Sequence, residues 1–237
     1  MEHRVFIAVG HGGDDPGAVA NGFREKDLNL EIAKACRDEL IRHGVEVKMD
    51  RETDVELSMS ETVNLCNSYA PSLALDIHNN AGGGDGAEVY YTVGGGTGKT
   101  LAVNILDEVV KIGQNSRGAK TRASSSGGDY YGFIRMTNPP AVIVECAFVD
   151  NLTDIQIIDT VAERVKMGKA IAKGVLKTLG VSYKAETEKP VSIPSQESSE
   201  IYRVQVGAFR NKNYAEALMN ELKEKGYEAF VVKGELK

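Results

Sequence analysis

Apolar and polar residues follow each other along the chain in blocks that predict strands and helices by turns. Apolar runs typical of buried strands occupy residues 5–9, 73–78 and 141–144. Two further strands are expected over residues 45–49 and 88–93. Apolar residues at helical spacing predict helices over residues 25–42, 62–69 and 100–114, and one long or two shorter helices over residues 153–179. Strands alternating with helices predict an α/β fold with helices on both faces of the sheet.

Residues 115–138 lack such a pattern and are expected to form a long polar loop. Loops of this length in compact domains are usually functional. The loop contains the aromatic residues Tyr130, Tyr131 and Phe133. Two interpretations remain open for them: contact with a ligand, or packing as a satellite of the core.

The composition changes near residue 183. Residues 183–199 are rich in charged residues, serine and proline, and have almost nothing to bury, which predicts a linker. Beyond it, a strand over residues 201–208, a helix over 213–225 and a strand over 229–232 are expected. The carboxyl-terminal part is therefore predicted to be a small β-α-β module.

Charge and hydropathy exclude several classes of partner. The net charge is −6, and no segment is long and basic enough to neutralise many phosphates, which argues against nucleic acid. No apolar stretch suffices for a signal peptide or membrane insertion, so we expect synthesis in the cytoplasm. Three cysteines, far apart among apolar neighbours, are expected to be buried thiols.

Candidate chemistry gathers where the predicted strands end. His11, His78 and Glu145 each follow an apolar run, and Glu25 opens the first long helix. In an open α/β sheet, sites lie at the carboxyl ends of strands and at the starts of the helices that follow. Two imidazoles and a carboxylate form a common zinc set that leaves a fourth position for water. A second carboxylate is then free to act as a base.

Each of these residues also has a purely structural interpretation. Glu25 could complement the dipole of its helix, and His11 could be an ordinary loop histidine. Glu145 is harder to explain in this way, because burying a carboxylate after an apolar run is costly unless something pairs with it. His3 and His43 are expected at the surface and at the polar end of a helix. The argument for a site therefore depends on the joint pattern.

Five motifs occur in one order: GHGGDDPGA at residues 10–18, EKDL at 25–28, RETD at 51–54, IHNN at 77–80 and VECAFVDN at 144–151. Together they resemble the zinc-dependent N-acetylmuramoyl-L-alanine amidases, which cut peptidoglycan. The resemblance extends over roughly residues 4–180. It implies a twisted, mostly parallel sheet between helices.

By position, the resemblance implies that His11, Glu25 and His78 bind Zn²⁺ and that Glu145 is the catalytic carboxylate. Asn80 matches an asparagine of the family and is expected to bind substrate or shape the site. The implied reaction is cleavage of the amide between the lactyl group of N-acetylmuramic acid and L-alanine by zinc-activated water. The partner would be bacterial peptidoglycan.

Other positions of the motifs are not assigned a direct role in catalysis. Arg51 and Asp54 match a pair that we expect to be structural. Asp76 departs from the family pattern, which usually has serine there. Because residues two apart on a strand share a face, Asp76 is expected to approach the metal or the groups that surround its ligands, and its role is left open.

The tail, from Tyr202 to Val232, resembles the first half of a sporulation-related repeat (SPOR), a domain that binds glycan strands stripped of peptide. The expected division is a catalytic domain (residues 1–181), a linker (182–199) and a partial repeat (200–237). Half a repeat leaves its strands and helix poorly covered. It is therefore expected either to pair with a second copy, giving a homodimer, or to stay loosely held.

Two alternatives to the amidase remain at this point. One is another zinc hydrolase of wall peptides or sugars, such as a carboxypeptidase or a deacetylase. The other is a wall-binding protein whose amidase-like domain is catalytically inactive. The expected place of action is the cell wall, reached after release or lysis, as for a mother-cell sporulation amidase, an autolysin or a phage endolysin.

Overall fold

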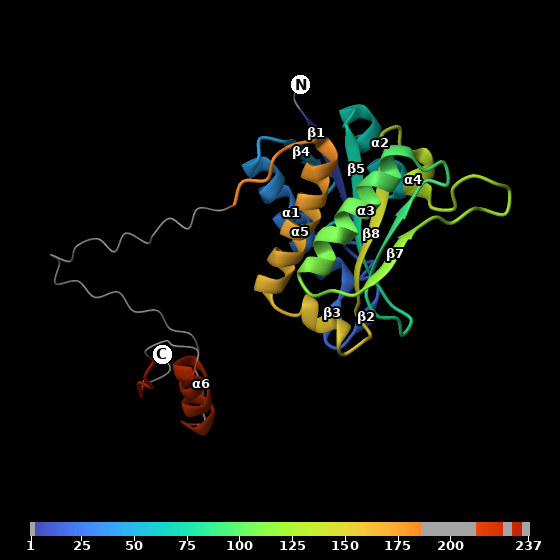
Figure 1. Cartoon of the computed structure of the whole chain (residues 1–237). Coiled ribbons are helices and arrows are strands. Elements are labelled where there is room, and N and C mark those ends of the chain that lie inside the picture. Colours follow the sequence, from blue (N-terminus) through green and yellow to red (C-terminus); the bar gives the residue numbers. More distant parts are fainter. Residues whose placement is uncertain (1–2, 186–211, 225–228, 234–237) are drawn as a thin grey trace. The chain divides into compact units, whose positions relative to one another are not determined.

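The structure is a computed structural model that describes residues 3–185, 212–224 and 229–233 of the 237-residue chain. The chain divides into two compact units, residues 1–186 and 187–237. The first unit contains the predicted α/β fold (Figure 1).

A six-stranded sheet forms the centre of this unit, in the order β4-β1-β5-β8-β6-β7. In that order the strands are Glu46–Met49, Arg4–Val9, Leu73–Asn80, Ala141–Phe148, Ala87–Tyr91 and Ser116–Lys120. All neighbouring strands are parallel except β8 and β6, which are antiparallel. The predicted mostly parallel sheet is confirmed.

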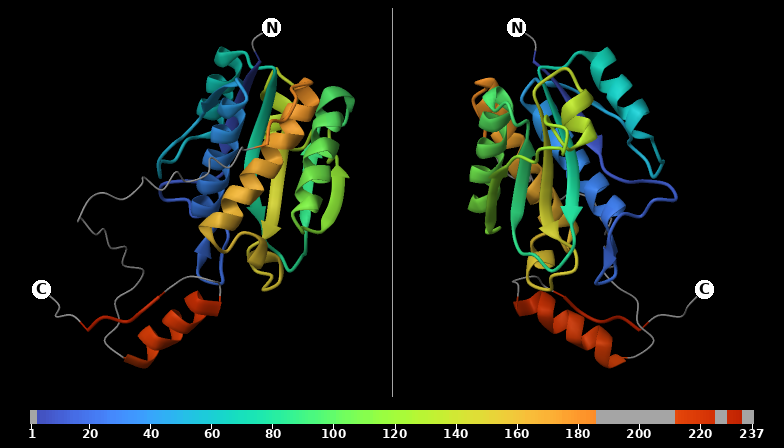
Figure 2. Two further views of the ribbon diagram at one scale, coloured as in Figure 1. Left: turned by 60° about the vertical axis from the view of Figure 1, so that its left-hand side comes forward. Right: turned by 90° about the vertical axis from the view of Figure 1, so that its right-hand side faces the viewer.

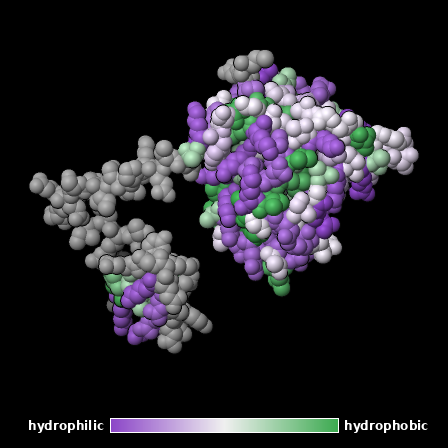
Figure 3. Space-filling view, in the orientation of Figure 1, coloured by the Kyte–Doolittle hydropathy of each residue, from purple (hydrophilic) through white to green (hydrophobic). Residues whose placement is uncertain are grey.

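Helices cover both faces of the sheet, as predicted (Figure 2). Because side chains alternate along a strand, Val5 and Ile7 of β1 join a large core with α1 (Glu25–Arg42), α3 (Gly96–Lys111) and α5 (Val161–Leu179). Phe6 and Ala8 point the other way, into a smaller core with α2 (Met59–Tyr69) and α4 (Gly132–Met136). The outer side of α1, α3 and α5 combines hydrophilic residues with a group of exposed hydrophobic ones (Figure 3).

Helix α5 lies tightly between α1 and α3 because two of its residues have no side chain. A Cβ added at Gly168 would lie 2.5 Å from the Ile32 carbonyl oxygen of α1, and one at Gly174 would lie 2.5 Å from the Ile105 Cα of α3. A capping box fixes the start of α5, where Thr160 and Glu163 exchange hydrogen bonds. A short 3-10 turn, η1 (Asp154–Ile157), precedes the helix, so residues 153–179 form a turn and one helix.

Both strands that carry predicted site residues are longer than expected. β5 continues beyond His78 to Asn80, and β8 continues beyond Glu145 to Phe148. The ladder pairs His78 with Glu145 and Asn80 with Phe148, with a shift of register between them. His78 and Glu145 therefore lie within paired strands and not at their ends, since the backbone pairing continues through polar positions.

The prediction of one long loop over residues 115–138 was wrong in two places. β7 lies along the edge of the sheet and pairs with β6 alone, so it has no need of an apolar face on both sides. α4 is a helix of five residues, too short for a periodic pattern. Between them, residues 121–131 form the protruding loop at the right of Figure 1.

In the second unit, α6 (Lys212–Glu224) confirms the helix predicted over residues 213–225. Residues 229–233 are not in a strand, contrary to the prediction for 229–232. A strand needs a partner for its backbone groups, and the described residues contain none for this segment. The strand predicted over 201–208 and the linker beyond 185 lie outside the described residues.

Two composition-based expectations can also be compared with the structure. Cys36, Cys66 and Cys146 are buried and free, as predicted. Among the helices of the described residues, none combines the length and the apolar character that crossing a bilayer requires.

Candidate active site

His11 lies in the loop after β1, with its backbone in the left-handed region at φ 63°. This conformation is unfavourable for a residue other than glycine, and such strain is common at functional positions. Backbone hydrogen bonds of 2.9 and 3.0 Å between Gly12 and Asp15 close the loop. Nδ1 of His11 donates to the Asp15 carboxylate at 2.7 Å. Nε2 lies 3.2 Å from Oε2 of Glu25.

A two-stranded hairpin brings Glu25 to this position. β2 (Val19–Ala20) and β3 (Phe23–Arg24) are joined by Asn21 and Gly22, both with positive φ, which is the turn that Asn-Gly favours. Helix α1 begins at the next residue, so the Glu25 carboxylate sits at the amino-terminal end of the helix, where negative charge is favoured.

The carboxylate of Glu25 is almost fully buried and is bonded on both oxygens. The Ala18 N–H donates to Oε2 at 3.0 Å, and the Asn79 N–H donates to Oε1 at 3.1 Å. Burial opposes its ionisation, but hydrogen bonds from His11 and His78 outweigh burial and hold the pKa of Glu25 well below its usual range. Glu25 is therefore fixed as a carboxylate.

His78 approaches Glu25 from β5. Its Nδ1 lies 3.0 Å from Oε1 of Glu25, and its Nε2 lies 3.3 Å from Oδ1 of Asp76. Burial alone would lower the pKa of His78, but Asp76 and Glu25 raise it well above the usual value. Asp76 thus contacts a histidine of the candidate site, which fits its expected place among the groups around the ligands.

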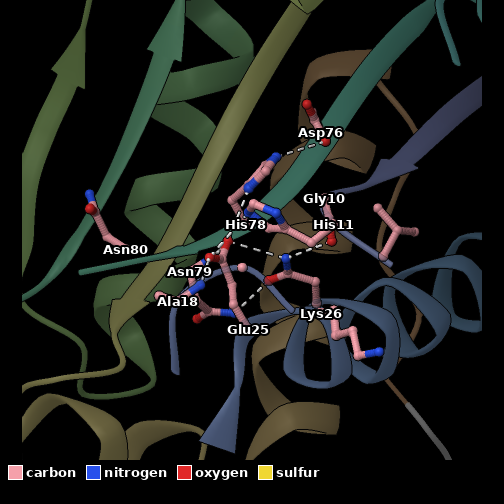
Figure 4. A network of polar contacts seen from close by, with 12 residues as sticks. Gly10, His11, Ala18, Glu25, Lys26, Asp76, His78, Asn79 and Asn80 are labelled. Carbon is pink, nitrogen blue, oxygen red and sulfur yellow. Dashed lines mark hydrogen bonds and ion pairs between the residues drawn. The ribbon is translucent and has the colours of Figure 1, made fainter. Parts of the chain in front are cut away.

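The two histidines are arranged alike around the central carboxylate (Figure 4). Each turns one nitrogen toward Glu25 and the other toward its own aspartate, Asp15 or Asp76. The rings are 5.1 Å apart at an interplanar angle of 83°. Ligand atoms of His11, Glu25 and His78 lie within 4.8 Å of one another, which makes the three a candidate metal site.

Glu145 lies beside His78 on the neighbouring strand. The two residues are paired in register between β5 and β8, so their side chains share a face of the sheet. Burial raises the pKa of Glu145 to about 7, although His78 opposes this shift. Oε2 of Glu145 is buried without a hydrogen-bond partner, which is typical of a group kept for a ligand or for chemistry.

Asn80 points away from the candidate metal site in Figure 4. Its Nδ2 donates to Oε1 of Glu88 at 3.0 Å, and its Oδ1 accepts from the Ala81 N–H at 2.9 Å. Glu88 in turn is paired in register with Glu145 between β6 and β8. Asn80 is thus connected through Glu88 to the face of the sheet that carries His78 and Glu145. Its use in substrate binding stays a prediction.

The contacts of Arg51 and Asp54 support the structural role expected of them. Arg51 is buried and donates to the carbonyls of Val9, Gly10 and Lys26. Asp54 accepts from the Lys26 ammonium at 2.7 Å and from the Gly13 N–H at 2.8 Å. Together they tie the loop that carries His11 to the first turn of α1.

The aromatic side chains within residues 115–138 differ in their surroundings. Some pack in the core and others remain available for contact with a ligand. Phe133 is fully buried in the smaller core. Tyr130 is about half exposed, and the Tyr131 ring lies 5.2 Å from it and 4.8 Å from that of Tyr90. Only the tyrosines therefore remain candidates for ligand contact.

Two imidazole nitrogens and a carboxylate converge beside a second, buried carboxylate in the carboxyl-terminal halves of parallel strands. This arrangement defines the class of a metal-dependent hydrolase. Comparison with known proteins agrees. Residues 5–177 match the model of the Amidase_3 family, N-acetylmuramoyl-L-alanine amidase, and residues 198–236 match that of the SPOR domain. The chain belongs to this amidase family of peptidoglycan hydrolases.

Its relatives include the N-acetylmuramoyl-L-alanine amidase CwlM of Bacillus licheniformis, which is 33% identical over 97% of this chain and 84% of that protein. The sporulation-specific N-acetylmuramoyl-L-alanine amidase of Bacillus subtilis is 31% identical over the same shares. An endolysin of Bacillus phage SPP1 is 31% identical over 80% of this chain and 71% of that protein.

Solved structures share the fold of the first unit. Cwp6 from Clostridium difficile matches with a TM-score of 0.74 and 38% identity over 76% of this chain and 30% of that chain. The catalytic domain of CwlV, an N-acetylmuramoyl-L-alanine amidase from Bacillus (Paenibacillus) polymyxa, matches with a TM-score of 0.69 and 25% identity over 76% and 99%.

Several residues of the site escaped the sequence analysis. Asp15 lies within the first motif, but nothing marked it as the partner of His11. Asn29, one helical turn after Glu25, donates to Glu25 Oε1 at 3.3 Å and accepts from Asn79 at 2.8 Å. The spacing of four residues on a helix was the available signal. Glu88 offered no comparable signal, because its importance depends on strand pairing.

Proposed function

We propose that His11, Glu25 and His78 hold a zinc ion, and that Glu145 is the base and acid in hydrolysis of the amide between the muramic acid lactyl group and L-alanine. The observation that carries the proposal is the convergence of the three ligand atoms within 4.8 Å, beside Glu145. The family match favours this reaction over that of a wall carboxypeptidase or deacetylase.

The chemistry of the donors fits zinc. Imidazole nitrogen and carboxylate oxygen are its common ligands, and three protein ligands leave a position open in catalytic sites. Nε2 of His11 and Nδ1 of His78 face the binding position, while Asp15 and Asp76 accept from the opposite nitrogens. Such outer carboxylates fix the ring and the tautomer of a metal-bound histidine.

When bound, zinc would polarise the amide carbonyl and lower the pKa of a water molecule to about 7. Glu145 accepts the proton of the attacking water and passes it to the leaving nitrogen of L-alanine. A pKa near 7 suits a group that must both accept and release a proton. Asn80 contributes by holding Glu88, which borders Glu145.

The test is mass spectrometry of the products released from purified peptidoglycan, with zinc, with a chelator and with Glu145→Ala. Intact stem peptides that begin with L-alanine are expected with zinc alone. Glu52→Ala, which removes an exposed carboxylate whose partner is Arg37 and not a residue of the site, is the matched control and should retain activity.

Other products would contradict the proposal. Shorter peptides or deacetylated sugars would assign the site to another zinc hydrolase. Binding to the wall without any product would leave the inactive wall-binding protein as the function.

For the tail we propose a wall-binding module over residues 200–237, joined by a linker at 182–199 to a catalytic domain at 1–181. Its match to the SPOR model and the separate compact unit that contains α6 support this. Deletion of residues 182–237 should reduce sedimentation with glycan strands stripped of peptide and leave hydrolysis of small soluble substrates intact. Equal sedimentation of both proteins would refute the binding role.

We also propose that this module pairs with a second copy of the chain. Light scattering coupled to size-exclusion chromatography should show a dimer that becomes a monomer when residues 182–237 are deleted. A monomer in both cases would contradict pairing.

The proposed place of action is the cell wall, reached after release from the producing cell or its lysis. A sporulation-specific amidase and an endolysin among the relatives support this. Fractionation of the native host during lysis tests it, because the protein should move from the cell contents to the wall.

A further inference from the structure

Glu88 is the centre of a second polar cluster, one strand beyond Glu145. Its side chain is 5% exposed and has four donors. Asn80 Nδ2 and Tyr90 Oη each donate to Oε1 at 3.0 Å. Arg117 Nε, at 2.8 Å, and Lys120 Nζ donate to Oε2. These donors lower the pKa of Glu88 against the effect of burial, so it is a fixed anion.

A β-bulge brings both cations to this anion. Residues three apart on a regular strand point to opposite faces, so Arg117 and Lys120 would be separated. In β7, Ala87 pairs with Ser116 but Glu88 pairs with Gly118, so Arg117 is the extra residue. Bulges re-aim side chains in this way and are common next to active sites.

Two cations meet at the edge of an acidic protein, and the charge of Asp85 also acts on Arg117. Two cations face one carboxylate, and each cation is about one third exposed. Within the described residues, the terminal nitrogens of Arg117 have no hydrogen-bond partner, since only Nε donates to Glu88. The guanidinium also lies 4.9 Å from the centre of the Phe148 ring, which restricts its orientation. The two terminal nitrogens of a guanidinium held in one orientation can donate together to both oxygens of a carboxylate.

The cluster lies in line with the proposed catalytic residues. His78, Glu145 and Glu88 are paired in one row across β5, β8 and β6, and β7 follows at the edge. With strands about 4.8 Å apart, the row places Glu88 roughly 10 Å from the His78 backbone. An extended peptide covers about 3.5 Å per residue. A substrate whose scissile amide lies at His78 can therefore bring its second or third peptide residue to the cluster.

We propose that Arg117 and Lys120, oriented by Glu88, form a subsite for a free carboxylate of the substrate peptide, two or three residues from the scissile amide. The inference rests on the proposed function, since it places the scissile amide at His78 and Glu145. Its consequence is selectivity: the enzyme prefers stem peptides with a free carboxylate at this position over those in which it is a carboxamide.

The experiment compares two synthetic N-acetylmuramoyl tripeptides that differ only in the free carboxyl groups of their second and third residues, which are carboxylates in one peptide and carboxamides in the other. The zinc-loaded full chain should show a kcat/KM about tenfold higher for the carboxylate, mainly through a lower KM. Arg117→Gln and Lys120→Gln should each reduce this ratio toward one, and the ratio is the readout because both substrates share any change in the catalytic groups. The preference should also weaken as salt is added.

Lys177→Gln is the matched control, because Lys177 is a partly exposed lysine of α5 paired with Asp107, away from the site. This variant should keep the wild-type ratio of kcat/KM between the carboxylate and the carboxamide substrates. Cleavage of both substrates at equal rates by the wild type would overturn the subsite and leave the amidase function standing. The same holds if the variants lose activity on both substrates equally. Cleavage of neither substrate would overturn the proposed function and the subsite with it.

Discussion

His78 and Glu145 stand directly opposite each other in the pairing of β5 with β8, one as a proposed metal ligand and the other as the proposed base. The pairing fixes their separation through two backbones and not through flexible loops. Glu88 is opposite Glu145 on the other side. Glu145 therefore lies between the imidazole of His78, which becomes positively charged when protonated, and the carboxylate of Glu88. The charges of both neighbours affect the pKa of Glu145.

Glu145→Gln should lower kcat/KM by about 10²-fold to 10⁴-fold, because general acid–base catalysis contributes that much. It should leave the zinc content unchanged, since Glu145 is not among the ligands proposed. Measurement of both quantities separates a catalytic role from a structural one. Glu52→Gln should change neither.

The pH dependence of the wild type should report the same group. A base must be ionised, and burial raises the pKa of Glu145 to about 7, so kcat/KM should fall as the pH drops through the pKa of Glu145. A bound cation favours the carboxylate and moves this limb to lower pH. Activity that rises toward low pH would contradict the role of base.

Asp76→Ala should weaken zinc binding by about 10-fold to 100-fold, because outer partners of metal-bound histidines contribute on that scale. Asp76→Asn keeps an acceptor oxygen for Nε2 of His78 and should lose less. Competition with a chromophoric chelator measures both affinities. Equal affinity in the wild type and the alanine variant would show that the 3.3 Å contact has no part in holding the ligand.

Gly10→Ala should disable the site without unfolding the domain. A Cβ at this position would lie 2.1 Å from Cε1 of His78, so the imidazole must move away. A displacement of about 1 Å can reduce activity 10²-fold. Activity with saturating zinc, together with circular dichroism, tests this. Gly98→Ala, where the nearest atom would be 3.5 Å away, should keep wild-type activity.

Asp50→Asn should change how stability depends on pH. Burial and the nearby Asp76 raise the pKa of Asp50 to about 6, although hydrogen bonds from Thr62 and the backbone oppose the shift. A raised carboxyl pKa favours the folded state below the unfolded pKa near 4, and this contribution is lost as pH rises through about 6. The wild type should therefore lose up to about 3 kcal/mol relative to the variant between pH 4 and pH 7.

Urea unfolding at the two pH values, in the presence of a chelator, measures this difference. An asparagine accepts from the same backbone N–H groups and faces Thr62 with its amide, so the fold should be kept. Asp38→Asn, at an exposed carboxylate of α1, controls for the change in net charge. Parallel pH profiles for the wild type and Asp50→Asn would contradict the prediction.

The sequence pattern indicated His11, His78, Glu145 and Glu25 as candidates, because each follows an apolar run or begins a periodic helix. The family resemblance, and not the pattern, implied which three of them bind the metal. The nitrogen that each histidine turns toward Glu25 could not be predicted. That choice depends on Asp15 and Asp76, whose side chains meet the rings only after the loop and the strand are folded.

The edge of the sheet was the least predictable region. β7 has the sequence Ser-Arg-Gly-Ala-Lys, without apolar alternation, and gains its strand conformation from pairing with β6. The bulge that directs Arg117 to Glu88 arises from the same pairing. The proposed subsite depends on the register between two strands, and the pattern of residues within a single strand does not indicate that register.

The two glycines of α5 have a consequence for the timing of biosynthesis. α5 is the last element of the first unit, yet Gly168 docks it on α1, the helix that begins with Glu25, and Gly174 docks it on α3. On the ribosome, helix α1, which carries the proposed ligand Glu25, therefore emerges long before the neighbour that completes its packing. A nascent or truncated chain that ends before residue 161 should be inactive. It contains the proposed ligand residues but lacks the helix that packs against α1 and α3.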